Sequence, residues 1–164
     1  MIARPDTAAL RTAATYIALL LGANLAWETA HVPLYTLWAE ASAGTLARAV
    51  LHCTAGDAVL GAAMLATALV VTRSWGWPSE GFGRVLVATT LLGVVTTVVI
   101  EWLSVEVWGR WAYSAAMPLL PPLGTGLTPV LQWLLLPPLG LWAARRWATR
   151  RPSPHDAPGR GASR

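Results

Sequence analysis

Four long apolar stretches alternate along this chain with short segments that are rich in polar residues, proline and glycine. The stretches cover residues 12–32, 47–72, 84–104 and 127–147. A hydrocarbon core of roughly 30 Å needs about 20 helical residues to cross it, so each stretch is long enough. The pattern predicts an all-α polytopic membrane protein, a bundle of four transmembrane helices that forms one domain over residues 1–150.

The composition agrees with the membrane class, because 55% of the 164 residues are hydrophobic and only 12% are charged. The single cysteine, Cys53, excludes an intramolecular disulfide. The net charge of +4 comes from arginines near the expected helix ends, without a basic face that carries stacking groups, so no nucleic-acid partner is expected. Residues 151–164, "RPSPHDAPGRGASR", lack an apolar period and are predicted to be a disordered cytoplasmic tail.

The arginines indicate the orientation of the four spans. If the N-terminus is cytoplasmic, ten of the twelve arginines lie inside and only Arg48 and Arg110 lie outside. An excess of arginine in short loops marks the cytoplasmic side of a bacterial inner membrane. The sequence therefore predicts a multi-pass inner-membrane protein with both termini in the cytoplasm.

Three acidic residues fall inside the apolar stretches at similar distances from inner arginines. Glu28 follows Arg11 by 17 residues, Asp57 precedes Arg73 by 16, and Glu101 follows Arg84 by 17. With a helical rise of about 1.5 Å per residue, all three lie roughly 24 to 26 Å above the inner arginines. Charged side chains at this depth are costly, so we expect these acids to face the bundle and to share one site.

Other polar residues extend this layer on every helix. Asn24, Glu28, His31 and Tyr35 follow i, i+4, i+7, i+11 and form one stripe on the first helix. Cys53 lies one turn from Asp57 on the second helix. The predicted pocket residues, in addition to the acids and histidines, are Asn24, Tyr35, Cys53, Trp102, Arg110, Tyr113, Thr128 and Gln132.

The connection between the third and fourth stretches contains several residues that cannot continue a helix. Its sequence over residues 118–129 is "PLLPPLGTGLTP". Irregular backbone near a membrane is tolerated only against protein or water. We therefore expect this connection to fold back as a lid over the polar pocket, with Arg110 as an available counter-ion.

The spacing of Glu28 and His31 suggests a metal site. Side chains at i and i+3 project to the same side of a helix, and carboxylate-bridged metal proteins use Glu-x-x-His in this way. Glu28, His31 and His52 are the predicted ligands, and imidazole with carboxylate suits zinc, iron or manganese. Asp57 and Glu101 are either further ligands or the general acid and base, and Glu106 is a third catalytic candidate.

Other interpretations of the same residues remain open. Glu28 can instead form a structural ion pair with Arg48 or Arg110, and His31 and His52 can be axial ligands of a haem. A Cys53 nucleophile activated by His52 is disfavoured, because adjacent helical residues diverge by about 100°. Carboxylates inside a membrane can also relay protons in a transporter.

Several motifs carry a resemblance to known sequences. The segments "NLAWE", "LHCTAGD", "EW" with "WAYS", and "LPPLGTGLTPVLQW" together resemble an uncharacterised family of small four-span bacterial inner-membrane proteins. The resemblance covers most of residues 24–138. It implies an integral membrane protein whose motif-rich side faces outward, and it implies no activity.

The function that these residues favour is an integral membrane enzyme with a metal-assisted polar site at the periplasmic side. Its expected partner is a membrane lipid or another amphiphilic substrate that reaches the site from the bilayer. A small proton-coupled transporter and a non-catalytic or haem-binding subunit of a membrane complex are the alternatives.

The predicted orientation can be tested with reporters fused to the C-terminus. A cytoplasmic reporter such as green fluorescent protein should be active there, and alkaline phosphatase should be inactive, because the positive-inside rule places this end in the cytoplasm. Active alkaline phosphatase at the C-terminus would require an odd number of spans or the opposite orientation.

Overall fold

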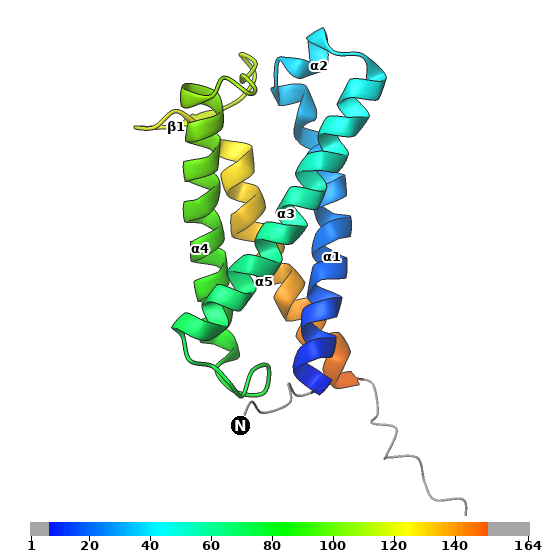
Figure 1. The fold of residues 1–164 in the computed structure, drawn as a ribbon, viewed down its shortest axis with the longest axis vertical. Helices are drawn as coiled ribbons and strands as arrows, with labels where there is room; N and C mark the ends of the chain where they lie inside the picture. The colour runs from blue at the N-terminus through cyan, green and yellow to red at the C-terminus, as the bar shows by residue number, and fades with distance from the viewer. Residues whose placement is uncertain (1–6, 151–164) are drawn as a thin grey trace, which may run out of the picture.

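The computed structural model describes residues 7–150, and the predicted tail lies outside the described residues. Its long helices are α1 (Thr7–His31), α3 (Ala43–Val71), α4 (Phe82–Trp102) and α5 (Leu127–Arg150) (Figure 1). Four helical segments are long and apolar enough to cross a membrane: Thr7–Leu34, Ala43–Val71, Phe82–Val107 and Leu127–Ala148. The predicted all-α bundle of four spans is confirmed.

Short elements connect the long helices at one end of the bundle. A 3₁₀ turn, η1 (Val32–Leu34), and a short helix, α2 (Leu37–Glu40), follow α1. α4 continues into a π-helical turn, η2 (Leu103–Val107), and strands β1 (Leu119–Leu120) and β2 (Thr125–Gly126) form a small antiparallel hairpin before α5. We call this end the site end, and the opposite end the arginine end.

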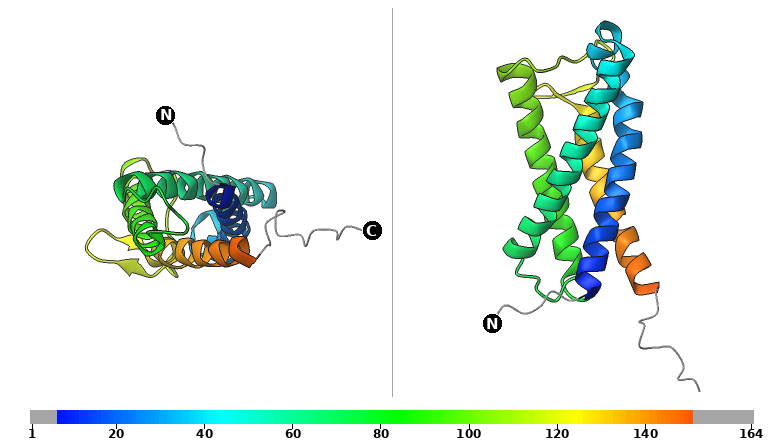
Figure 2. Two further views of the ribbon diagram at one scale, coloured as in Figure 1. Left: turned by 90° about the horizontal axis from the view of Figure 1, so that it is seen from below. Right: turned by 45° about the vertical axis from the view of Figure 1, so that its right-hand side comes forward.

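The four helices form a ring in which each contacts two neighbours. α1 packs against α3 and α5, and α4 also packs against α3 and α5 (Figure 2). The start of α1 and the end of α5 lie together at the arginine end. α3 crosses the bundle obliquely, so it lies near α4 at the arginine end and closer to α1 at the site end (Figure 1).

The interior is packed tightly near the middle of the bundle, on the side toward the arginine end. Here Leu20 of α1 lies against Gly61 of α3, and the ring of Trp133 of α5 lies against Gly93 of α4. A Cβ added at Gly61 or Gly93 would approach these side chains to 2.2 and 2.1 Å. Small residues at such contacts let membrane helices approach closely. The two contacts form a layer that we call the floor.

The segment of residues 108–117 crosses the site end of the bundle. Its backbone pairs with the residues after η1, because Thr36 N–H donates to the Ala112 carbonyl (3.0 Å) and Ser114 N–H donates to the Leu34 carbonyl (2.9 Å). Tyr35 and Tyr113 form an isolated β-bridge. We call residues 108–117 the roof. It joins the α4 side of the ring to the α1 side.

The close contact at Gly93 predicts a loss of stability on enlargement. Gly93→Ala should lower the free energy of unfolding by about 1 to 3 kcal/mol, because the rigid indole of Trp133 cannot move away as a flexible chain would. Thermal unfolding in detergent would measure the loss. Gly22→Ala is the control, since a Cβ at Gly22 meets nothing within 4 Å, and equal stability of the two variants would contradict the packing argument.

Candidate functional site

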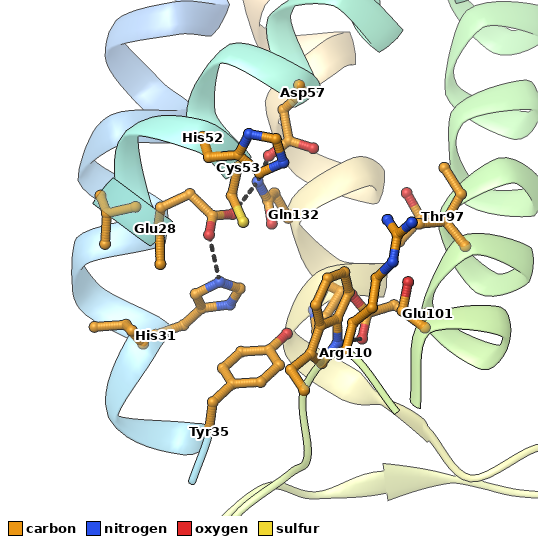
Figure 3. Close-up of a pocket in the computed structure, with 18 of the residues that line it drawn as sticks. Glu28, His31, Tyr35, His52, Cys53, Asp57, Thr97, Glu101, Arg110 and Gln132 are labelled. Carbon is orange, nitrogen blue, oxygen red and sulfur yellow. Dashed lines mark hydrogen bonds and ion pairs between the residues drawn. The ribbon is translucent and has the colours of Figure 1, made fainter. Parts of the chain in front are cut away.

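A cavity of about 520 Å³ lies between the helices at the site end. All four helices contribute to it, together with the roof, and side chains with polar atoms project into it from several sides (Figure 3). The three acids that were predicted to lie at one depth, Glu28, Asp57 and Glu101, all line this one cavity.

The cavity lies between the roof and the floor. Trp111 of the roof lines it at the site end, and Trp133 of the floor lines it at the other. Its exposed lining residues are His52 and Gly56 on α3 and Trp108 and Arg110 after η2. The cavity therefore opens on the side of α3 and the start of the roof, at the end of the bundle where α3 and α4 lie apart (Figure 1).

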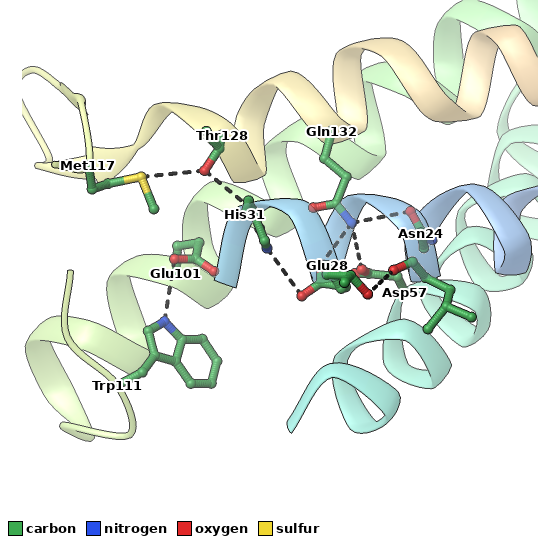
Figure 4. A network of polar contacts seen from close by, with 11 residues as sticks. Asn24, Glu28, His31, Asp57, Glu101, Trp111, Met117, Thr128 and Gln132 are labelled. Carbon is green, nitrogen blue, oxygen red and sulfur yellow. Dashed lines mark hydrogen bonds and ion pairs between the residues drawn. The ribbon is translucent and has the colours of Figure 1, made fainter. Parts of the chain in front are cut away.

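Gln132 joins three helices inside the bundle. Its amide nitrogen lies 2.7 Å from Asp57 Oδ2, 3.1 Å from Glu28 Oε1 and 3.2 Å from Asn24 Oδ1 (Figure 4). The two carboxyl oxygens are therefore at most about 6 Å apart. An amide nitrogen has only two hydrogens for these three acceptors. The amide is also uncharged, so it does not balance the charge of a carboxylate in this position.

Glu28 also pairs with His31 on the same helix. Glu28 Oε2 lies 3.1 Å from His31 Nε2, and His31 Nδ1 lies 3.3 Å from Thr128 Oγ1 on α5 (Figure 4). Both ring nitrogens thus have a partner, and the imidazole is 7% exposed. A carboxylate on one nitrogen fixes the orientation of the ring, which is how histidines that transfer protons are positioned.

Glu101 lies on the opposite side of the ring and is bound by the roof. Tyr113 O–H and Trp111 Nε1–H both donate to Glu101 Oε2, the indole at 3.4 Å. Burial, together with the hydrogen bond to Glu101, raises the pKa of Tyr113. Burial and then the charge of Glu101 raise the pKa of Tyr35 as well. Both phenols therefore keep their protons at neutral pH and act as donors.

Two basic residues of the cavity, Arg110 and His52, lie at its opening. Arg110 is exposed, and its guanidinium lies 4.6 Å from the centre of the Trp108 ring. His52 on α3 is exposed as well. Within residues 7–148, neither Arg48 nor Arg110 forms an ion pair with Glu28, which pairs with His31 instead. The described residues therefore do not form the alternative ion pair between Glu28 and an arginine.

The structure brings most of the predicted pocket residues together. Tyr35, Cys53, Arg110 and Gln132 line the cavity, while three further residues bind those that line it: Asn24, Tyr113 and Thr128. His31 and His52 also line it, although His52 lies at the exposed rim and not against Glu28.

Two predicted residues are not part of the cavity lining. Glu106 and Trp102 are both exposed. Trp102 directly follows Glu101, so it points about 100° away from it around the helix. Glu106 lies in the π-helical turn η2, five residues beyond Glu101, and that turn presents it to the outside. The structure does not place these two predicted site residues in the cavity.

The predicted lid was also placed too far along the chain. Of residues 118–129, only Pro129 lines the cavity. The roof over residues 108–117 covers it instead, because its backbone pairs with residues 34–36. The hairpin of β1 and β2 projects to the side of the bundle (Figure 1).

Some lining residues were not predicted. Ser104 lies at i+3 from Glu101, so the helical spacing applied to the first helix would have found it. Trp111 and Trp133 were interpreted only as membrane anchors or left unassigned, since a tryptophan in a membrane protein commonly marks an interface.

The predicted metal site stays a prediction. Among the described residues, no three His, Cys, Asp or Glu side chains are grouped closely enough to hold a metal ion. Glu28 and His31 are adjacent, but they bind each other and Gln132 or Thr128. The chemistry that the arrangement offers directly is proton transfer between carboxyl, imidazole and hydroxyl groups.

The role of Gln132 predicts a loss of stability when its amide is removed. Gln132→Leu should lower the free energy of unfolding by about 1 to 3 kcal/mol, because buried acceptors on α1 and α3 lose their donor. Thermal unfolding in detergent would measure this. The control is Thr90→Val, whose hydroxyl bonds only the Leu86 carbonyl of its own helix, and an equally small effect of both changes would contradict the role of the amide.

Comparison with known proteins adds no assignment. No family model, no curated protein and no solved structure matches this chain. The resemblance to a family of four-span inner-membrane proteins therefore stays a prediction, and function has to be argued from the geometry of the cavity.

Proposed function

We propose that this chain is an integral membrane enzyme that acts on a lipid or another amphiphilic substrate by acid and base catalysis. The observation that carries the proposal is the cavity itself. It is large, it is lined mainly by apolar side chains, and it gathers carboxyl and imidazole groups from separate helices. Such a pocket with few convergent polar groups is the usual form of a ligand site.

The position of the opening supports an amphiphilic substrate. The floor lies at the inner end of the cavity, and the opening lies on the side of α3 and the start of the roof. A molecule in the membrane can place its polar end in the cavity while its apolar chain stays between lipids. With the predicted orientation, the substrate comes from the outer leaflet of the inner membrane.

The acids can take different roles because their surroundings differ. Glu101 accepts hydrogen bonds from Tyr113 and Trp111 on one oxygen, so its carboxyl group is held in place and its other oxygen can take a proton from a substrate. Asp57 and Glu28 both contact the amide nitrogen of Gln132 on the other wall, so a proton bound there can be donated to a substrate. The Glu28–His31 pair can exchange that proton with the cavity.

Packing below the cavity argues against the transporter alternative. A transporter needs a polar path through the whole bundle, and the floor fills this path with Leu20 and Trp133 against two glycines. The haem alternative would require His31 to give up one of its two present partners. Neither alternative is favoured by a specific feature of the described residues.

The proposal predicts that Glu101→Gln abolishes activity while the protein still inserts into the membrane. Removing a buried charge lowers the cost of insertion, so a loss of activity would reflect lost chemistry. The purified protein would be reconstituted into liposomes of phosphatidylethanolamine, phosphatidylglycerol and phosphatidylcholine, and mass spectrometry would follow the conversion of each lipid.

Glu106→Gln is the matched control, because it removes the same charge at an exposed position outside the cavity lining. The control should retain activity. Absence of any converted lipid with the wild-type protein would count against these lipids as substrates, and full activity of Glu101→Gln would remove Glu101 from the site. Metal analysis of the same protein would test the predicted zinc, iron or manganese.

A further inference from the structure

Two acids in the cavity have no cationic partner among the described residues. Glu28 pairs with His31, but neither Asp57 nor Glu101 has a basic side chain within ion-pair distance there. Glu101 is 8% exposed, so it is almost fully withdrawn from solvent. A buried carboxylate without a counter-ion is unfavourable, and a bound cation would remove this cost.

The wall of α4 also presents hydrogen-bond acceptors that are not used. Thr97, Glu101 and Ser104 all line the cavity and lie on one face of the helix. Both bonds to Glu101 fall on Oε2, so Oε1 accepts none from the described residues. Ser104 is 1% exposed, and its hydroxyl has no hydrogen-bond partner there. Buried polar groups without partners usually mark a missing ligand or water.

The opening carries a charge of the opposite sign, that of Arg110. Arg110 and His52 are exposed at the rim, whereas Glu28 and Glu101 are buried and Asp57 is partly buried. Aromatic rings of Tyr35, Trp111 and Trp133 complete the lining, and such rings attract cations. A ligand that matches this order has a positive group at its inner end and a negative group near the rim.

We infer that the cavity binds an amphiphile with a zwitterionic headgroup whose primary ammonium lies among Asp57, Glu101 and Ser104 and whose phosphate lies near Arg110. This inference rests on the proposed function, for which it names the substrate class. A primary ammonium supplies three N–H donors to the unused acceptors, while a quaternary ammonium supplies none. Phosphatidylethanolamine has this chemistry.

Binding to the wild-type protein tests the inference without any variant. The full-length protein in detergent would be titrated with phosphatidylethanolamine, phosphatidylglycerol and phosphatidylcholine that carry identical acyl chains, and native mass spectrometry would measure occupancy. Phosphatidylethanolamine should bind roughly tenfold or more tightly than the other two, because charge-assisted hydrogen bonds contribute that much. Equal binding of phosphatidylethanolamine and phosphatidylglycerol would overturn the inference.

Variants then show which residues cause the preference for phosphatidylethanolamine. Glu101→Gln and Asp57→Asn should bring phosphatidylethanolamine binding close to that of phosphatidylglycerol, whereas the matched control Glu106→Gln should leave the preference unchanged. Arg110→Gln should weaken all three phospholipids alike, because they share the phosphate. An ethanolamine preference that survives both Glu101→Gln and Asp57→Asn would place the ammonium elsewhere and overturn the inference.

The binding test and the conversion test can fail separately. Conversion of lipids without an amine preference in binding would keep the proposed enzyme and overturn the zwitterionic headgroup. Amine-selective binding without conversion of any lipid would support the headgroup and count against the enzyme.

Discussion

The structure depends on the rule that a buried polar group inside a membrane bundle has to find its partner within the protein. Gln132 meets this rule for three helices, because one amide nitrogen reaches acceptors on α1 and α3 from α5. A hydrogen-bonding group buried among apolar helices has no water with which it can form a hydrogen bond. The amide therefore fixes how α1, α3 and α5 are rotated relative to one another, and it turns Glu28 and Asp57 inward.

The floor and the roof lie at the two ends of the cavity. Gly61 and Gly93 allow Leu20 and Trp133 to fill the bundle, so nothing of the cavity continues toward the arginine end. The roof is held by backbone pairing with residues 34–36 and by the bonds from Trp111 and Tyr113 to Glu101. The exposed lining residues place the opening on the side of α3 and the start of the roof, and this side faces the lipid if the bundle spans a membrane.

Charge is distributed unevenly within this space, and the proposals rest on that distribution. One acid is paired with a histidine, two acids lack a cation among the described residues, and an arginine lies at the rim. A site built only for stability would pair these charges internally, because an unpaired buried charge reduces stability. The arrangement is understandable if a ligand supplies the missing positive charge.

The sequence by itself determined the four spans and the depth of the acids, since both follow from apolar length and from the helical rise along single segments. Helical spacing also found the stripe of Asn24, Glu28 and His31. Only the tertiary structure decided which segment covers the cavity, and that Glu106 and Trp102 lie outside it, because these depend on a π-helical turn and on pairing between residues 34–36 and the roof. Likewise, the bond between Gln132 and Asp57 joins residues 75 positions apart, and no local pattern specifies how two helices rotate against each other.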